Sequence, residues 1–175
     1  DDVDPAIVTV TYTVGSGGAN QNFGAQATIS CNTGYNGGTQ VRTCGADGNW
    51  TGQDASCTIV ACGNPGAPNN GSKTGSTYTY AQTVGFSCNP GFTLSRAGTI
   101  VCGADGTWRL NALTGPSQGV GADARPTCDD IDECALSPCG SNATCSNSEG
   151  GFDCTCNAGY PLGDPFTGCI SDCGD

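Results

Sequence analysis

Histidine is absent from this chain of 175 residues. Its absence removes the commonest general base and the commonest zinc ligand, and it excludes Ser-His-Asp and Cys-His nucleophilic sites. Positive charge is also scarce, with 5 Lys and Arg against 16 Asp and Glu and a net charge of −11. Binding to nucleic acid or to anionic lipid needs clustered cations, so neither partner is expected. The composition therefore argues against an enzyme and against a nucleic-acid-binding protein.

Long apolar runs are missing as well. No stretch reaches the roughly 18 apolar residues of a membrane-spanning helix, so no membrane span is expected. The same lack leaves no material for one large hydrophobic core. The chain opens at Asp1 with no initiator Met and no signal peptide, which favours a processed or excised segment.

Cysteine is abundant instead, with 14 residues alongside 29 glycines. Such a density is typical of an oxidising compartment, so we expect an extracellular, secreted or cell-surface protein. Pieces of about 50–60 residues bury too little surface to fold alone, and each disulfide supplies roughly 2–4 kcal/mol. Paired thiols oxidise in such a compartment, which argues against zinc sites made of Cys. The cysteines therefore predict small stapled modules.

One pattern occurs twice: Cys-Asn-x-Gly-aromatic, then Cys-Gly-Ala-Asp-Gly-x-Trp, then a further Cys. The first copy has Cys31, Cys44, Trp50 and Cys57, and the second has Cys88, Cys102, Trp108 and Cys128. The Asp-Gly pair before each Trp predicts a tight turn between strands. Each Trp is the one large apolar side chain of its unit, so we expect it in a small core beside the disulfides.

This repeat resembles the sushi module, also called the complement control protein (CCP) module. That family has four cysteines, paired first to third and second to fourth. In the second copy the resemblance implies the disulfides Cys62–Cys102 and Cys88–Cys128. The stretch from Leu110 to Arg125 is longer than is usual in the family and is expected to form a surface loop. The first copy lacks the first cysteine, so the family pattern implies Cys31–Cys57 and assigns no pair to Cys44.

A different cysteine spacing begins after Asp130 and resembles an EGF-like module. The hairpin motif Cys-x-x-Gly-aromatic of that family is matched by Cys156-Asn157-Ala158-Gly159-Tyr160. The resemblance implies the disulfides Cys134–Cys145, Cys139–Cys154 and Cys156–Cys169.

Acidic residues at the start of this module, from Asp130 to Glu133, match the calcium-binding subclass, as do Asn147 and Phe152. Calcium prefers six to eight oxygen ligands, some of them backbone carbonyls. By resemblance, the side-chain ligands are Asp130, Glu133 and Asn147, and the carbonyl ligands are Ile131, Ser148 and Gly151. A solvated acidic linker is the alternative. A Ca2+ ion here is expected to stiffen the joint that follows Cys128.

Glycosylation sites are a further expectation. Asn-x-Ser/Thr sequons occur at Asn49, Asn70 and Asn142. Thr144, just before Cys145, lies where EGF-like modules can carry O-linked fucose.

Two cysteines, Cys44 and Cys173, have no pair assigned by either family pattern. The ending Cys173-Gly174-Asp175 resembles Cys62-Gly63-Asn64, where the second sushi-like module opens. Three hypotheses follow. Cys173 of one copy bonds Cys44 of the next in a head-to-tail polymer, the chain is cut from a longer tandem protein, or the two cysteines close one chain into a ring.

A strand with alternating faces is predicted from Ile7 to Val14. Such a strand near a terminus is either a donor that pairs with a neighbouring molecule or an ordinary edge strand of its own module.

We therefore predict an all-β fold of small disulfide-rich modules in an elongated string. The expected boundaries are 1–60 and 61–129 for the sushi-like modules, 130–170 for the EGF-like module, and 171–175 for the start of a next module or an inter-subunit link. The predicted function is a structural subunit or repeat unit of an extracellular fibre or surface appendage, with other copies of itself as partners. The alternative is a recognition or adhesion ectodomain that binds protein or glycan ligands.

Overall fold

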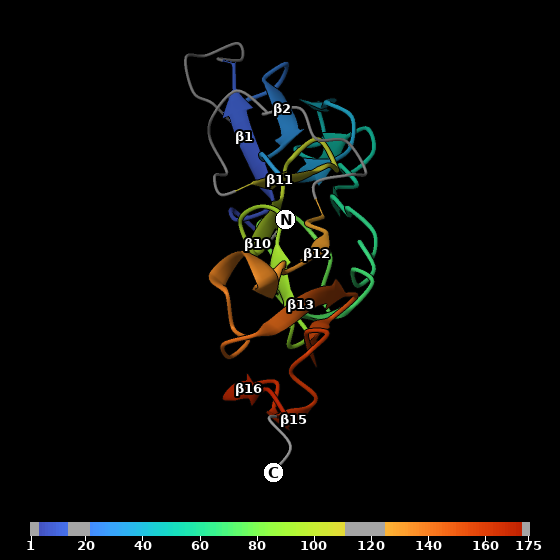
Figure 1. Ribbon diagram of the computed structural model, residues 1–175. Coiled ribbons are helices and arrows are strands. Elements are labelled where there is room, and N and C mark those ends of the chain that lie inside the picture. The colour runs from blue at the N-terminus through green and yellow to red at the C-terminus, as the bar shows by residue number, and fades with distance from the viewer. Residues whose placement is uncertain (1–3, 14–21, 111–124, 173–175) are drawn as a thin grey trace. The chain divides into compact units, whose positions relative to one another are not determined.

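The computed structural model describes residues 4–13, 22–110 and 125–172. Its regular structure is β-strand throughout, apart from one short 3-10 helix, so the prediction of an all-β protein is confirmed (Figure 1). Within the described residues, no helix has the length and apolar character needed to cross a membrane. The chain divides into two compact units. One comprises Asp1–Pro65, Gly75–Val84 and Thr99–Ala124, and the other comprises Gly66–Thr74, Gly85–Gly98 and Arg125–Asp175.

The first sushi module is built on a four-stranded antiparallel sheet, drawn in blue to cyan in Figure 1. Its strand order is β1-β2-β4-β5, with β1 at Val8–Tyr12, β2 at Gln26–Cys31, β4 at Gln40–Cys44 and β5 at Trp50–Thr51. Alternate side chains of β2 are buried, as expected of a strand with one face on a core. A second pair of strands, β3 at Tyr35–Asn36 and β6 at Thr58–Ile59, closes the module.

The strand predicted at Ile7–Val14 is β1, and it pairs along its whole length with β2. It is the terminal strand of the sheet order. The edge-strand alternative is therefore what the structure shows, and pairing of the other edge of β1 with a neighbouring molecule stays a prediction.

The second sushi module repeats this plan. Its sheet has the order β11-β10-β8-β7, with β7 at Gly71–Thr74, β8 at Thr83–Cys88, β10 at Thr99–Cys102 and β11 at Trp108–Leu110. Val84 and Ile100 are fully buried in it. A smaller pair joins β9 at Phe92–Leu94 to β12 at Cys128–Asp130. Most of the long stretch after Leu110 lies outside the described residues.

The EGF module consists of the helix η1 and two hairpins. These are η1 at Glu133–Leu136, β13 at Ala143–Ser148 with β14 at Gly151–Cys156, and β15 at Leu162–Asp164 with β16 at Gly168–Ile170. The first hairpin places Cys145 opposite Cys154. Its turn is formed by Glu149 and Gly150, and Gly150 has a φ of 82°, a conformation that favours glycine.

Six disulfides link the pairs that the family resemblances imply. They are Cys31–Cys57, Cys62–Cys102, Cys88–Cys128, Cys134–Cys145, Cys139–Cys154 and Cys156–Cys169. Their Cα atoms lie 5.5 to 5.8 Å apart, within the ordinary range for a disulfide. Cys44 is buried at the end of β4, with 4% of its surface exposed, and Cys173 lies outside the described residues.

The two tryptophans differ in burial. Trp108 is 5% exposed, and its indole N–H donates to the carbonyl of Gly63 over 3.1 Å, so its predicted place in a core is confirmed. Trp50 is only half-buried and lies beside Tyr12, with 6.0 Å between ring centroids. The predicted Asp-Gly turns are also present, since Gly48 and Gly106 have φ values of 80° and 76°.

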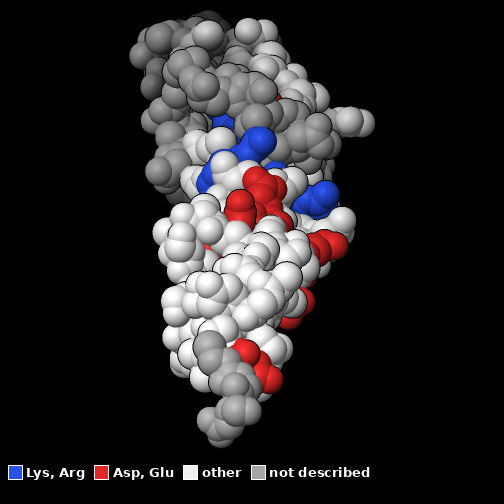
Figure 2. All heavy atoms as spheres, in the orientation of Figure 1, with Lys and Arg blue, Asp and Glu red and all other residues white. Residues whose placement is uncertain are grey.

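Charged side chains are sparse on the face shown in Figure 2, where small acidic groups lie next to basic ones. Asp105 and Arg109 form an ion pair, with 2.7 Å between Asp105 Oδ2 and Arg109 Nη2. The hydrogen bond from Arg109 lowers the pKa of the Asp105 carboxyl to about 2, with further help from Thr107.

Candidate calcium site at the module joint

The candidate site forms where β12 leaves the second sushi module and enters the EGF module, entirely within the second compact unit. Asp130 is the last residue of β12 and pairs with Phe92 of β9. The N–H of Ile131 then donates to the carbonyl of Gly91 over 2.9 Å. Asp132 caps η1 by accepting the N–H of Cys134 over 3.1 Å. These backbone bonds fix the direction in which the acidic segment leaves the sheet.

The β13–β14 hairpin comes to meet Asp130. One carboxylate oxygen of Asp130 accepts the backbone N–H of Gly150 over 2.6 Å, and the other accepts the side-chain amide of Asn147 over 2.8 Å. Two of the predicted ligands, Asp130 and Asn147, are thus brought into direct contact although 17 positions separate them in the chain.

Glu133 supplies a second carboxylate at the start of η1. Its Oε2 is buried and has no hydrogen-bond partner in the structure. A buried carboxylate oxygen without a partner is costly, and a bound cation removes that cost. This orphaned oxygen is the observation that best fits a metal ion at the site.

The remaining predicted ligands are backbone carbonyls. Ser148 and Gly151 lie opposite each other at the end of the hairpin, and the Gly151 carbonyl accepts the Ser148 hydroxyl over 3.0 Å. Ile131 lies between Asp130 and η1 and is 37% exposed. The predicted ligands, three carbonyls, the Asn147 amide and two carboxylates, all offer oxygen atoms, which is the donor type that Ca2+ prefers.

The structure also defines how the site must adjust on binding calcium. The Asn147 amide nitrogen faces Asp130, so its oxygen has to turn toward the ion for Asn147 to be a ligand. Among the residues that the structure describes, no three His, Cys, Asp or Glu side chains converge on one point. The predicted ligand set accordingly has two carboxylates, and its other members are an amide and backbone carbonyls.

Contacts that the sequence did not predict hold the hairpin against the sushi module. The Asn70 amide donates to Glu149 over 2.9 Å. A Cβ on Gly91 would overlap the backbone of Gly150, and a Cβ on Gly150 would lie 2.9 Å from the Phe92 ring. The only signal in the sequence was the repeated Gly-aromatic pair that includes Gly91 and Phe92.

The four candidate glycosylation residues all use their side chains within the chain. The amides of Asn49, Asn70 and Asn142 donate to Asp47, Glu149 and the Cys169 carbonyl, and the Thr144 hydroxyl donates to Asn157. Attachment of a sugar has to accommodate these bonds, most of all at Asn70, because its bond joins two modules.

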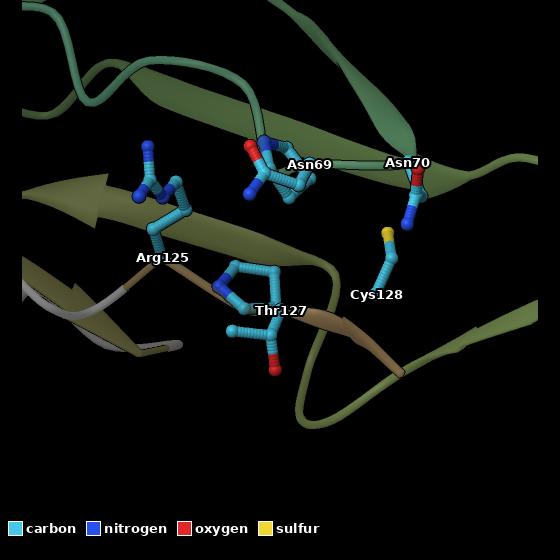
Figure 3. A pocket seen from close by; sticks show the side chains of 7 residues that line it. Asn69, Asn70, Arg125, Thr127 and Cys128 are labelled. Carbon is cyan, nitrogen blue, oxygen red and sulfur yellow. The ribbon is translucent and has the colours of Figure 1, made fainter. Parts of the chain in front are cut away.

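A pocket of about 280 Å³ lies in the part of the second sushi module that contains Asn70 and Cys128, close to the EGF module (Figure 3). Its lining consists of Pro68, Asn69, Asn70, Arg125, Pro126, Thr127 and Cys128. The Arg125 guanidinium donates to the carbonyl of Ala67 over 3.2 Å. The charged and amide side chains that line the pocket are thus Arg125, Asn69 and Asn70, and no lining residue is of a type that suggests catalysis.

Comparison with known proteins agrees with this architecture. The model of the Sushi repeat (SCR repeat) family matches residues 4–57 and 62–117, and that of the calcium-binding EGF domain matches residues 130–169. The second match covers the candidate site, so the module is of the calcium-binding kind.

Several curated proteins are similar. Mouse "Sushi, von Willebrand factor type A, EGF and pentraxin domain-containing protein 1" is 29% identical over 158 residues, which is 89% of this chain and 4% of that protein. Mouse fibulin-7 is 37% identical over 100 residues, covering 57% of this chain and 20% of that protein. Rabbit E-selectin is 28% identical over 147 residues, covering 79% and 24%.

The chain thus spans a quarter or less of the length of each of these three relatives. Its modules and disulfides are those of proteins that work outside the cell or at its surface, and such domains are typical of non-enzymatic proteins. The chain belongs to the sushi repeat family, and a calcium-binding EGF domain follows its two repeats.

Proposed function

We propose that this chain is a structural repeat unit of an extracellular fibre or surface appendage, in which the joints between modules are held by backbone pairing and by calcium. The observation that carries the proposal is the construction of the linkers. Each linker is a strand of the module before it, since Ile59 pairs with Tyr35 and Asp130 pairs with Phe92.

In the first joint, the linker residue Val60 makes a backbone hydrogen bond to each of the two modules that it connects. The N–H of Val60 donates to the Gly34 carbonyl over 2.8 Å, and the Val60 carbonyl accepts the N–H of Tyr80 over 2.8 Å. Val60 is 3% exposed, and a Cβ on Gly34 would overlap the Tyr80 ring. A linker with its polar groups satisfied and its side chain buried resists bending, which suits a load-bearing or spacing role.

The second joint has the same backbone bond, from Ile131 to Gly91, and adds the calcium site. The proposed ligands are Asp130, Glu133 and Asn147 through side chains and Ile131, Ser148 and Gly151 through carbonyls. Asp130 belongs both to the linker strand and to the ligand set, so bound calcium ties the linker to the hairpin. The ion's role in this proposal is mechanical rather than catalytic.

Head-to-tail assembly, through disulfide and β-strand contacts, is the finer form of the proposal. It includes the predicted bond between Cys173 of one unit and Cys44 of the next, either between subunits or between repeats of one polypeptide. Because the Cys44 side chain is buried, the incoming segment has to enter the edge of the first module to reach it.

A recognition or adhesion ectodomain is the second candidate. Similarity to E-selectin favours it, as does Leu136, which is 83% exposed on η1 and is available to contact a ligand. Protein or glycan ligands are the partners that this alternative implies.

The two candidates are separated by non-reducing peptide mapping of the native protein, combined with negative-stain electron microscopy. A peptide linking Cys44 to Cys173, together with filaments or species of multiple mass, supports the structural proposal. The mass after reduction then distinguishes linked subunits from tandem repeats. Single particles without that linked peptide refute the fibre and leave the recognition candidate.

A further inference from the structure

Each of the three modules contains the same five-residue turn, Cys-Asn-x-Gly-aromatic, at Cys31–Tyr35, Cys88–Phe92 and Cys156–Tyr160. In all three the aromatic N–H donates to the Asn carbonyl, over 3.0, 3.2 and 3.0 Å in chain order. The three glycines share the left-handed conformation, with φ values of 89°, 83° and 91°. The EGF module and the two sushi modules therefore present one local structure.

The first two of these turns are covered by the module that follows. Gly34 lies under the Tyr80 ring, and Gly91 lies against the backbone of Gly150. In both cases a side chain at the glycine would overlap its neighbour, so the close approach depends on glycine. The carbonyls of both glycines also accept an N–H from the linker.

The third turn has no such neighbour. Around the position that a Cβ on Gly159 would take, the described part of the chain places no atom within 4 Å. Beside it, the cross-strand pair Leu162 and Ile170 is 46% and 61% exposed. Apolar side chains this exposed, next to a glycine that leaves room for close approach, form a surface suited to packing against another module.

The strand register extends the comparison. Leu162 lies opposite Ile170, and the same register continued places Asp172 opposite Tyr160. That is the position that Ile59 takes opposite Tyr35 and that Asp130 takes opposite Phe92. The structure ends β15–β16 at Leu162 and Ile170 and does not form the pair of Tyr160 with Asp172, so a docked module is expected to extend the hairpin by this pair.

We infer that the turn Gly159–Tyr160, together with Leu162 and Ile170, is the docking surface for a further sushi-type module that follows residue 172 in the same polypeptide. Both a sushi module, at Gly34, and an EGF module, at Gly91, cover such a turn in this chain. A sushi module is the expected occupant here because Cys173-Gly174-Asp175 resembles Cys62-Gly63-Asn64, with which the second sushi module opens. The inference deepens the proposed function and rests on it for the existence of a following unit. The large size of the similar proteins is in keeping with further modules.

The test compares hydrogen exchange in the full-length protein with exchange in the 175-residue chain, both in calcium. Peptides covering residues 159–162 are expected to exchange at least roughly tenfold more slowly in the full-length protein. Peptides covering the docked turns at Gly34 and Gly91 serve as internal references and are expected to be equally slow in both. Equal rates for 159–162 in the two proteins, whether fast or slow, overturn the inference.

A pair of variants in the full-length protein separates docking from folding. Gly159→Val is expected to abolish the protection of residues 159–162. Gly48→Val is the matched control, because Gly48 has a similar φ of 80° and also has open space around its Cβ position. Retained protection in Gly159→Val refutes the docking surface. Protection at 159–162 in a native protein that forms no filaments supports this surface while refuting the fibre, so the two proposals fail separately.

Discussion

Neutralising Glu133 gives the sharpest test of the calcium site. Glu133→Gln keeps the shape of the side chain and removes one of the two carboxylate charges of the proposed site. At a Ca–O distance of about 2.4 Å, a unit charge attracts a divalent ion by roughly 3.5 kcal/mol even at the dielectric constant of water. Because the glutamine oxygen retains part of that attraction, we expect calcium affinity to fall by about 100-fold, or roughly 2.7 kcal/mol.

In the calcium-free protein, the same substitution is expected to change the thermal stability in the opposite direction. Glu133 Oε2 is buried without a hydrogen-bond partner, so its charge is unfavourable when no ion is bound. Glu133→Gln is therefore expected to leave the thermal stability unchanged or raised in EDTA, and to lower it in calcium. Calorimetric calcium titration and thermal unfolding with and without calcium measure the two effects.

Asp129→Asn is the control for these experiments. It removes the same charge one residue before Asp130, but the Asp129 carboxylate accepts the Thr127 hydroxyl and is exposed. A screened charge at that place is expected to alter calcium affinity less than about threefold. If Glu133→Gln and Asp129→Asn weaken binding equally, Glu133 is not a ligand and the site has been assigned wrongly.

Three further changes address the rest of the chain. Gly34→Val is expected to loosen the first joint, because the added side chain overlaps the Tyr80 ring, and faster amide exchange of residues 58–62 measures it. Acidification from about pH 3.8 to pH 2 is expected to lower the free energy of unfolding, since the depressed pKa of Asp105 stabilises the fold only above that window. The Asp105→Asn variant is expected to remove this component of the pH dependence. The component is small, because Arg109 and Asp105 are partly exposed and solvent screens their interaction. Trp108→Phe is expected to cost about 1 kcal/mol or more in urea unfolding through its lost backbone hydrogen bond, and an unchanged midpoint contradicts that.

The sequence predicted the stapled modules well because cysteine spacing and the Gly-aromatic and Gly-x-Trp motifs are local patterns. Trp108 lies in the predicted core for this reason. Trp50 has the same motif but is half-buried beside Tyr12, a partner from a strand whose register the motif does not encode. The motif fixes the turn before each Trp, whereas burial depends on what the rest of the chain brings over it.

The candidate calcium site was likewise predictable only in part from the sequence. Asp130, Glu133 and Asn147 were predicted by family resemblance, and the structure brings Asp130 to Asn147. The hydrogen bond between Asn70 and Glu149 was not predictable, because 79 positions separate the two residues and the sequon at Asn70 carries no information about Glu149. The open turn at Gly159 required comparison of three-dimensional neighbours, since its sequence is equivalent to those of the two covered turns.

The border between the compact units does not follow the border between the modules. The foot of the second sushi module, including Gly66–Thr74 and Gly85–Gly98, groups with the EGF module. A fragment cut at residue 130 therefore leaves behind the strand that pairs with the linker, the glycine that accepts the Ile131 N–H, and the amide that holds Glu149. We therefore expect that an EGF module transferred to another protein keeps its calcium affinity and its orientation only if Gly66–Thr74 and Gly85–Gly98 of the preceding sushi repeat are transferred with it.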